Sequence, residues 1–571
     1  MKKNLILLPV LLSIVSLFLE QQVTMTVFWL VIINLLDVTV LLILVVEIVS
    51  SFRLAPYKYI YVKNNVFSLL FTAAFVLLFV YSKIQTFQVH FNPHLVDPSL
   101  TAAAFKNTFL VLKVLTRFRR LNALLESISL KPAQTIVLSF LLVILVGALI
   151  LMIPFTSSSK EGLDFLDALF TATSAVCVTG LIVVDTATAY SLWGHIAIMA
   201  LIQIGGLGIM LLSYFSIFIL RRGISRQEKL IAAYMLSQDD LRSIKKTVIL
   251  IISATLLFEA LGAVMLYLSS PSFSGAYGGR LFAALFHAVS AFCNAGFALF
   301  SDSLEGLYGN LLVNGTVAFL IIVGGLSFGV HLNLLTFFSS ARRSSRSGRR
   351  LSVNTKVVLI ISAGLILGGA LIFYALEHSG VLKGLGTGRQ YLAAFFQSVT
   401  LRTAGFNTIP MGALGSATYL FMCLFMFVGG AAGSTAGGIK VNNLAAMGAY
   451  FRSLLRESKE ITLFRSSLSS DIVLKSFTIA TFGLVTVFLG TFILMLTEDA
   501  PAIKILFEAV SAFGTVGLSA GITGDLSPLG KCVIIILMFL GRIGPLTFIA
   551  AAGSGQQRVE IRYPVTDLSI G

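Results

Sequence analysis

The sequence predicts an all-α polytopic membrane protein, in which an N-terminal four-helix bundle precedes four tandem units of membrane helix, pore loop and membrane helix. Three observations support this prediction: the composition, a fourfold repeat and the placement of basic loops. Of the 571 residues, 57% are hydrophobic and 12% are charged, whereas soluble domains use about 45–50% apolar and about 25% charged residues. Apolar stretches of about 20 residues recur along the chain, each long enough to cross a hydrocarbon core of about 30 Å.

Four short segments align without gaps and define the repeat. They read LFTATSAVCVTGL (169–181), LFHAVSAFCNAGF (285–297), AFFQSVTLRTAGF (394–406) and LFEAVSAFGTVGL (506–518). Each has a phenylalanine ten residues before a glycine, in the pairs Phe170/Gly180, Phe286/Gly296, Phe395/Gly405 and Phe507/Gly517. Self-similarity at a fixed period indicates repeated structural units. We therefore divide the chain into the bundle, 1–130, and units 1 to 4, at 131–241, 242–350, 351–467 and 468–571.

Every unit has the same predicted layout. A long apolar span comes first, near 135–155, 246–268, 356–377 and 473–496. A second long span follows, near 192–220, 310–338, 416–450 and 531–552. The aligned segment between them is too short to cross a membrane as a helix and ends in a polar, glycine-containing stretch. It is therefore predicted to be a re-entrant helix and loop.

The basic residues set the predicted orientation. They gather between one unit and the next, at 221–229, 242–246, 341–350 and 451–465. Cytoplasmic loops carry such an excess of lysine and arginine, so the net charge of +16 is interpreted as topology and no nucleic-acid partner is expected. We expect the re-entrant loops to enter from the outer face of the inner (plasma) membrane, with both chain termini in the cytoplasm.

The glycine-containing ends of the four segments are suited to lining a cation path. Irregular backbone at membrane depth is tolerated where it is buried in protein or lines a water-filled cavity. Potassium-type filters replace the hydration shell of the ion with rings of backbone carbonyls, and glycine allows the backbone conformations that such rings need. One such glycine alone would suggest helix packing or a turn, but four in register favour a shared filter.

These segments resemble the filter segments of the Trk/Ktr/HKT superfamily of potassium transporters, in SAVCVTGL, SAFCNAGF, LRTAGFNT and GTVGLSAG. GGAAGSTAGGIK at 429–440 resembles the intramembrane loop of that family's third unit. The resemblance implies pseudo-fourfold symmetry and these ion-coordinating residues: Val178, Thr179 and Gly180; Asn294, Ala295 and Gly296; Thr403, Ala404 and Gly405; Thr515, Val516 and Gly517. In the family, a serine in place of the first filter glycine is associated with sodium preference, so Gly180 implies potassium.

The second spans share a glycine pair, which predicts a gate. Units 1 to 3 have IGGLG, VGGLS and VGGAA, whereas unit 4 has LGRIG, so that Arg542 fills a glycine position of the repeat. In unit 3 the pair opens a run rich in glycine, and each glycine weakens a helix by about 1 kcal/mol relative to alanine. We expect a broken helix beneath the filter that acts as a movable gate. Its candidate residues are Gly429, Gly430, Gly433, Ser434, Thr435, Gly437, Gly438, Lys440 and Arg542.

Arg542 is expected to face the pore. Placing an arginine at mid-bilayer costs about 2.5–3.5 kcal/mol or more, and Arg542 lies about half way along its apolar span. In the pore, one positive charge would hinder cations without closing the path to them. The alternatives are that Arg542 pairs with a buried acid or extends to the membrane interface.

Four apolar spans precede the repeat, near 4–19, 26–50, 66–83 and 101–123. No cleavage site follows the first span, so it is expected to be retained. The region resembles a voltage-sensor domain, with Glu47 in the acid position and a basic row on one helical face formed by Lys106, Lys113, Arg117 and Arg120. Ser68 stands where such sensors carry an acid, and the row is sparse. An accessory bundle and a weak voltage sensor both remain open.

The sequence thus predicts the potassium-translocating membrane subunit of a Trk/Ktr-type uptake system, with sodium transport or sodium-coupled potassium transport as the alternative. An enzyme is not expected, because the one HxxxH pair among the six histidines, His90 and His94, lies outside the apolar spans and the chain has no Walker A motif. Potassium, or sodium in the alternative, is the substrate, and no organic cofactor is expected in this chain. The resemblance also implies a homodimer in membrane lipid and a separate cytosolic nucleotide-binding regulatory ring of the TrkA/KtrA type.

Overall fold

The computed structural model describes residues 132–159, 162–208, 244–269, 279–342, 351–458 and 460–552, and five isolated positions before them. Apart from those five positions, the expected N-terminal bundle lies outside the described residues, including Glu47, Ser68 and the basic row. Most of the expected basic loops at 221–229, 242–246 and 341–350 also lie outside them.

The first helix of each unit contains a segment long and apolar enough to cross a membrane. These helices are α5 (Pro132–Leu151), α11 (Ile244–Ser269), α15 (Val353–Glu377) and α19 (Ser470–Thr497). The only strands among the described residues, β1 (Thr462–Leu463) and β2 (Ser466–Ser467), form a small antiparallel hairpin. The predicted all-α polytopic membrane fold is confirmed for this part of the chain.

Each predicted re-entrant segment contains a helix of 12 to 14 residues, which we call the pore helix of its unit. The pore helices are α6 (Phe165–Val176), α12 (Arg280–Phe292), α16 (Thr387–Thr400) and α20 (Ala502–Gly514). The second helices follow as α8 (Leu192–Leu207), α13 (Leu311–Gly325), α17 (Ser416–Phe427) and α21 (Pro528–Ile543). Short turns connect them: α7 (Thr186–Ala189), η4 (Glu305–Leu307), η6 (Met411–Ala413) and η7 (Thr523–Asp525).

Polar caps fix where three of the second helices begin. The side chain of Ser191 accepts a hydrogen bond from the Gly194 amide, and Ser527 does the same for Gly530. Asn310 accepts from two amides of α13. A side-chain oxygen at this position satisfies backbone donors that have no partner within the helix. The polar residue before each apolar run therefore sets the point at which the chain re-enters the membrane.

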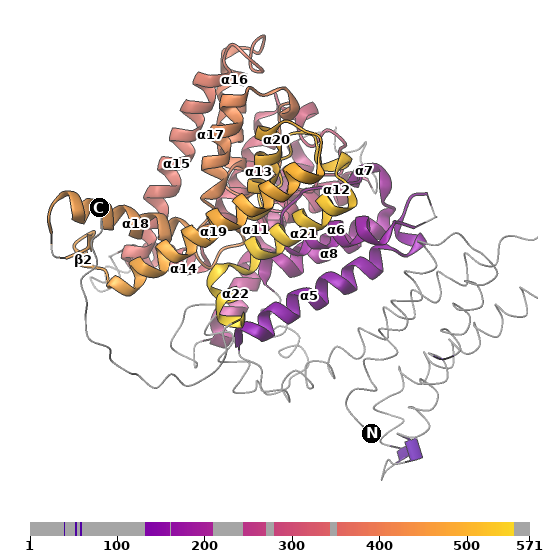
Figure 1. The fold of residues 1–571 in the computed structure, drawn as a ribbon, viewed down its shortest axis with the longest axis horizontal. Coiled ribbons are helices and arrows are strands. Elements are labelled where there is room, and N and C mark those ends of the chain that lie inside the picture. Colours follow the sequence, from indigo (N-terminus) through magenta and orange to yellow (C-terminus); the bar gives the residue numbers. More distant parts are fainter. Residues whose placement is uncertain are drawn as a thin grey trace, which may run out of the picture.

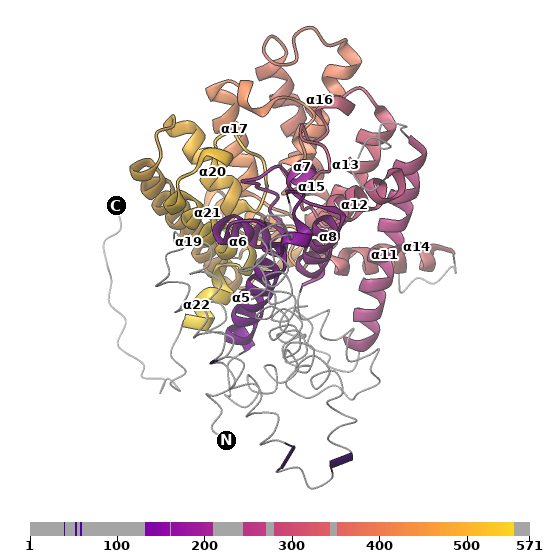
Figure 2. The same cartoon turned by 90° about the vertical axis from the view of Figure 1, so that its right-hand side faces the viewer.

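The four units close into a ring. The second helix of each unit packs against the pore helix of the next, through the pairs α8 with α12, α13 with α16, α17 with α20 and α21 with α6. Figure 2 shows unit 1 in indigo and purple, flanked by unit 2 in magenta and unit 4 in yellow, with unit 3 in salmon above. In Figure 1, α22 (Pro545–Ala552) lies beside α5, and Gln134 Nε2 donates to Ala551 O at 3.0 Å. The last unit thus contacts the first.

The second span is broken in every unit in which both halves are described. In unit 2, α13 is followed by α14 (Phe328–Arg342) at a bend of 99°, and in unit 4, α21 is followed by α22 at 95°. In unit 3, an irregular segment separates α17 from α18 (Val441–Leu455). The sequence predicts the break in unit 3, and the structure has further breaks in units 2 and 4 that the sequence prediction does not include. Each bend follows immediately after the glycine-containing pair, where helix propensity is lowest.

The first glycine of the pair has a packing role that repeats around the ring. A Cβ at Gly205, Gly324 or Gly541 would overlap a carbonyl oxygen at the end of that unit's own pore helix. These carbonyls belong to Val176, Phe292 and Phe513, each six residues after the unit phenylalanine. In unit 3, Gly429 instead abuts the carbonyl of Gly437. Glycine therefore lets the second helix approach the pore-helix backbone directly.

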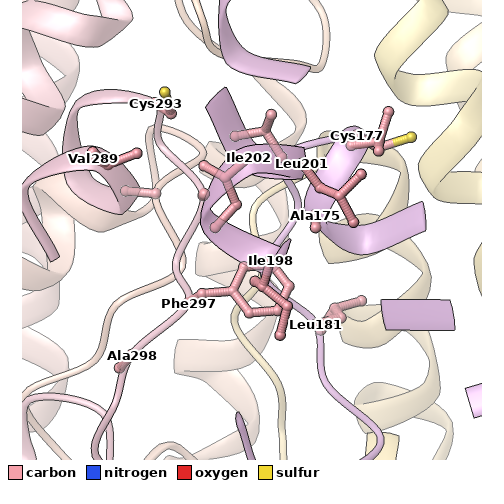
Figure 3. Close-up of a cluster of buried hydrophobic side chains, with 14 of the residues drawn as sticks. Ala175, Cys177, Leu181, Ile198, Leu201, Ile202, Val289, Cys293, Phe297 and Ala298 are labelled. Atoms are coloured by element: carbon pink, nitrogen blue, oxygen red, sulfur yellow. The ribbon is translucent and has the colours of Figure 1, made fainter. Parts of the chain in front are cut away.

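Apolar side chains fill the space between neighbouring units. Figure 3 shows Ile198, Leu201 and Ile202 of α8 between the pore segments of units 1 and 2. Leu181 lies on one side and Phe297 on the other, and all five residues belong to one buried cluster. Close packing of this kind makes a rigid support. The pore segments are therefore held from behind by the second helices.

Replacing Gly541 by alanine is expected to destabilise the protein, because the added methyl group would overlap Phe513 O and force α21 away from α20. Overpacking of this kind costs about 1–3 kcal/mol. The measurement is the thermal unfolding midpoint of purified protein in detergent, followed by size-exclusion chromatography.

Gly364→Ala, in α15, is the matched control. Among the described residues, no atom of another element lies within 4 Å of a Cβ at Gly364, and alanine favours a helix by about 0.5–1 kcal/mol. Its unfolding midpoint should stay the same or rise. Equal midpoints for Gly541→Ala and wild type would contradict the close approach.

Candidate functional site

The stretch that follows each pore helix has an unusual backbone that repeats in all four units. Eight residues after the unit phenylalanine, a non-glycine residue is left-handed: Val178 (φ 56°), Asn294 (φ 59°), Thr403 (φ 67°) and Thr515 (φ 50°). Two residues later a glycine is also left-handed: Gly180 (φ 91°), Gly296 (φ 70°), Gly405 (φ 80°) and Gly517 (φ 90°). Non-glycine residues rarely adopt such angles. Four equivalent occurrences therefore indicate one backbone conformation shared by all four segments.

The four segments meet in a closed ring. At each of the four glycines, an added Cβ would press on the backbone carbonyl of the residue before the glycine of the next unit. The pairs are Gly180 with Ala295, Gly296 with Ala404, Gly405 with Val516 and Gly517 with Thr179. The structure thus brings the four predicted filter segments together, with a glycine at each of these contacts. We call residues 178–180, 294–296, 403–405 and 515–517 the filter segments.

Pore-helix serines hold the filter segments from behind. Ser174 Oγ accepts from the Gly180 amide at 3.0 Å, and Ser511 Oγ accepts from the Gly517 amide at 3.1 Å. Ser290 Oγ donates to Phe297 O at 2.8 Å. Unit 3 has Val399 at this position, so it departs from the pattern. Hydrogen bonds of this kind restrict the segments to one conformation and so preserve the spacing of their carbonyls.

Other pore-helix side chains hold the backbone that follows the filter segments in the sequence. In unit 4, Glu508 is fully buried, and its Oε1 accepts from the Ala520 amide at 2.9 Å. At the equivalent positions of unit 2, His287 Nε2 accepts from the Leu299 amide at 3.3 Å. Glu508 also accepts from Thr523 Oγ1 at 2.9 Å. One polar side chain near the middle of each of these pore helices therefore anchors the strand leaving the filter.

The loops of units 2 and 3 are joined beyond the pore helices. Asn407 Nδ2 donates to Glu305 Oε1 at 2.7 Å, and Asn407 O accepts from the Leu304 amide at 3.0 Å. Burial raises the pKa of Glu305 and the nearby Asp302 acts in the same direction, while the bond from Asn407 lowers it. These bonds add a polar connection between two units to their apolar packing.

The predicted gate residues lie in an irregular segment, 428–440, that we call the intramembrane loop. Thr435 is its most connected residue: its Oγ1 lies 2.9 Å from Gly324 O, and its own carbonyl accepts from Arg542. Gly437 packs so tightly against Thr515 of a filter segment that a Cβ would not fit. The loop thus lies directly against the filter segments.

The remaining gate candidates shape the loop itself. Gly433 and Gly438 are left-handed, with φ of 76° and 63°. Ser434 Oγ donates to Ala431 O at 2.7 Å. Lys440 Nζ donates to Ala436 O at 2.6 Å and to Gly437 O at 3.1 Å. A Cβ at Gly430 would lie 2.8 Å from Gly325 O, in the glycine pair of unit 2.

Arg542 connects the loop to unit 1. It occupies the last turn of α21, and its guanidinium donates to Thr435 O and, at 2.5 Å, to Gly205 O. Both recorded partners are backbone carbonyls, so within the described residues no acid partner of Arg542 is recorded. Because its donors bond to the loop and to α8, the alternative in which Arg542 extends to the membrane interface is not what the structure shows.

One residue of this site is missing from the sequence prediction. Arg402, next to the third filter segment, is 6% exposed, and its Nη2 donates to Gly429 O at 2.7 Å. The sequence does point to it, because Arg402 is the one charged residue in the aligned segment 394–406. Alignment of the repeats alone does not reveal its partner, which lies 27 residues further along the chain.

Comparison with known proteins agrees with this geometry. The family model for TrkH, described as a cation transport protein, matches residues 102–557. The chain is 39% identical over 443 residues to the Ktr system potassium uptake protein B of Bacillus subtilis, covering 77% of this chain and 97% of that protein. It is 41% identical over 435 residues to the protein of the same name from Vibrio alginolyticus, covering 76% and 93%.

Two further relatives extend the comparison. The potassium/sodium uptake protein NtpJ of Enterococcus hirae is 36% identical over 447 residues, covering 77% of this chain and 97% of that protein. The crystal structure of the potassium transporter TrkH from Vibrio parahaemolyticus matches with a TM-score of 0.62 at 19% identity, covering 85% of this chain and 98% of that chain. The structural match supports the fold, and the family model spans most of the sequence. The chain belongs to the TrkH family of cation transport proteins.

Proposed function

We propose that this chain is the potassium-translocating membrane subunit of a Trk/Ktr-type uptake system. The observation that carries the proposal is the closed ring of four filter segments, each with left-handed residues at two equivalent positions. Backbone carbonyls in such a ring can replace the hydration shell of a potassium ion. The membrane potential, negative inside, drives the ion through, so the chain needs no bond-making chemistry and no organic cofactor.

The filter residues are those of the four filter segments, and Gly180 supports potassium as the ion. The intramembrane loop and Arg542 form the gate. With the loop against the filter segments and the guanidinium fixed on Thr435 O, a displacement of the loop is required for ions to pass. The positive charge of Arg542 adds an electrostatic barrier to cations on the same path.

The assembly follows from the same family. We propose four pore units at 131–241, 242–350, 351–467 and 468–571, a homodimer in the inner (plasma) membrane, and both termini in the cytoplasm. A separate cytosolic nucleotide-binding ring would regulate the gate through the basic loops. The N-terminal region, 1–130, is proposed as an accessory bundle, with a weak voltage sensor as its alternative.

The test is potassium uptake by the full chain in proteoliposomes under an imposed membrane potential, negative inside. Uptake of potassium that exceeds uptake in protein-free vesicles is expected, because the ring provides a desolvation site for the ion. The same chain should restore growth of a potassium-uptake-deficient cell at low external potassium. Absence of potassium uptake by folded protein, with and without a ring subunit, would refute the proposal.

Replacing Gly180 by serine is expected to increase sodium uptake relative to potassium uptake. Gly180 is left-handed, and an added Cβ would press on Ala295 O, so a side chain there must displace one carbonyl of the ring. The measurement is the ratio of potassium to sodium uptake in proteoliposomes. Gly412→Ser is the matched control, since a Cβ there would meet only one atom, at 3.8 Å. An unchanged ratio in Gly180→Ser would contradict the role of this residue in selection.

Replacing Arg542 by alanine is expected to raise potassium flux, because it frees Thr435 O and removes a positive charge from the path. A hydrogen bond to a charged group contributes about 1.5–3 kcal/mol, so flux is expected to rise about tenfold or more if loop release limits transport. Arg542→Lys retains the charge without the fork of donors and should give an intermediate flux. Lower or unchanged flux in folded Arg542→Ala would count against a barrier at this position.

A further inference from the structure

Arg402 stands where the other units have small side chains. Seven residues after each unit phenylalanine, the chain has Cys177, Cys293, Arg402 and Gly514. Burying a charged group is costly unless its donors are bonded, and Arg402 is 6% exposed. The bonds that this residue makes therefore indicate why a cation is placed beside the filter.

Arg402 bonds to the intramembrane loop and to a second filter segment. Its Nη2 donates to Gly429 O, at the start of the loop, at 2.7 Å. Its backbone carbonyl accepts from Asn294 Nδ2, in the filter segment of unit 2, at 3.2 Å. Bonds from a charged donor are about twice as strong as neutral ones. Loop, third filter segment and second filter segment are thus connected through one residue.

Besides its bond to Arg402 O, the Asn294 side chain also contacts the intramembrane loop. Its Oδ1 lies 3.4 Å from Thr435 Oγ1, whose shorter bond goes to Gly324 O. Asn294 is 1% exposed, so water does not compete freely for its amide. The side chain of Asn294 therefore lies between the far part of the loop, at Thr435, and Arg402, which holds the near part, at Gly429.

The filter residues attached to these contacts have a strained backbone. Asn294 and Thr403 are left-handed without being glycine, with φ of 59° and 67°. Such conformations cost of order 1–3 kcal/mol and persist where the surroundings hold them in place. Removing the bonds of Arg402 and Asn294 removes part of what holds these two segments.

We propose that Arg402 and the Asn294 side chain couple the position of the intramembrane loop to the geometry of the second and third filter segments, so that ion selectivity depends on whether the loop is in place. The proposal rests on the proposed function, because it assigns selection to those segments. Arg402 acts as a positioning residue, through Gly429 and Asn294, and the gate and the filter are then parts of one device.

The test measures the ratio of potassium to sodium uptake by the full chain in proteoliposomes. Arg402→Met keeps a long unbranched side chain but removes the guanidinium, and it is expected to lower the ratio about three- to tenfold, in line with the loss of one or two hydrogen bonds. Asn294→Gly keeps the left-handed backbone accessible and should lower the ratio in the same direction. Arg402→Lys, which retains a charged donor, should restore part of it.

Cys177→Ala is the matched control for Arg402→Met. Cys177 occupies the same repeat position in unit 1 and is buried, and among the described residues no hydrogen bond from its side chain to the loop is recorded. This variant should keep the wild-type ratio. A wild-type ratio in both folded Arg402→Met and Asn294→Gly would overturn the coupling; if Arg402→Met does not fold, Asn294→Gly alone decides.

A second comparison separates coupling from a merely structural role. Arg542→Ala frees the loop at Thr435 and is expected to lower the ratio when Arg402 is present. In the Arg402→Met background it should cause a smaller change, because the loop then acts on the second filter segment through Asn294 alone. Equal factors in both backgrounds would overturn the proposal. If wild-type protein takes up no potassium, the proposed function itself fails, and that outcome is distinct from a change in the ratio between variants.

Discussion

The structure depends on one close approach, that of a glycine to a backbone carbonyl, made at two levels around the ring. In three units, the glycine at the first position of the aligned pair in the second helix, Gly205, Gly324 or Gly541, rests on the last part of the unit's own pore helix. In all four units, the filter glycine rests on a carbonyl of the next filter segment. Backbone polar groups inside a membrane cannot rely on water. Contacts between glycines and backbone carbonyls, with no side chain between them, therefore bring the carbonyls together and fix their spacing.

Much of this arrangement could be predicted from the sequence. The ten-residue spacing from Phe170 to Gly180, repeated three times, locates the re-entrant segments and the glycines of the ring. Composition and span length suffice for the membrane fold. The bend at Leu326 and Ser327 is harder to predict from the sequence. VGGLS contains only two glycines, and membrane helices often contain glycine without breaking. Aligning the repeats cannot predict the bond between Arg402 and Gly429, because the other three units have no arginine at the position of Arg402.

The four units share a scaffold but differ in a few residues beside the filter segments and the intramembrane loop. Units 1 and 2 have small cysteines behind their filter segments, whereas unit 3 has Arg402 and the intramembrane loop, and unit 4 has Arg542. The two arginines hold opposite parts of the same loop, at Gly429 and Thr435. The repeated scaffold thus surrounds an intramembrane loop that, among the described residues, occurs in unit 3 and is held by one arginine from unit 3 and one from unit 4. Under the proposed function, differences at a few positions of a repeated scaffold are enough to make a symmetric pore a regulated one.

Under the proposed function, the bends of the second spans affect where the resistance to ion flow is located. Because α14 and α22 leave their preceding helices at 99° and 95°, these segments run across the direction of the spans and do not prolong the passage along it. Under the proposed function, the narrow part of the ion path then consists of the filter segments and the intramembrane loop. Most of the transmembrane voltage would then fall across that short section, where moving one charge is worth about 2.3 kcal/mol per 100 mV. Under the proposed function, a small displacement of a few residues there would therefore change the ion flux through the whole protein.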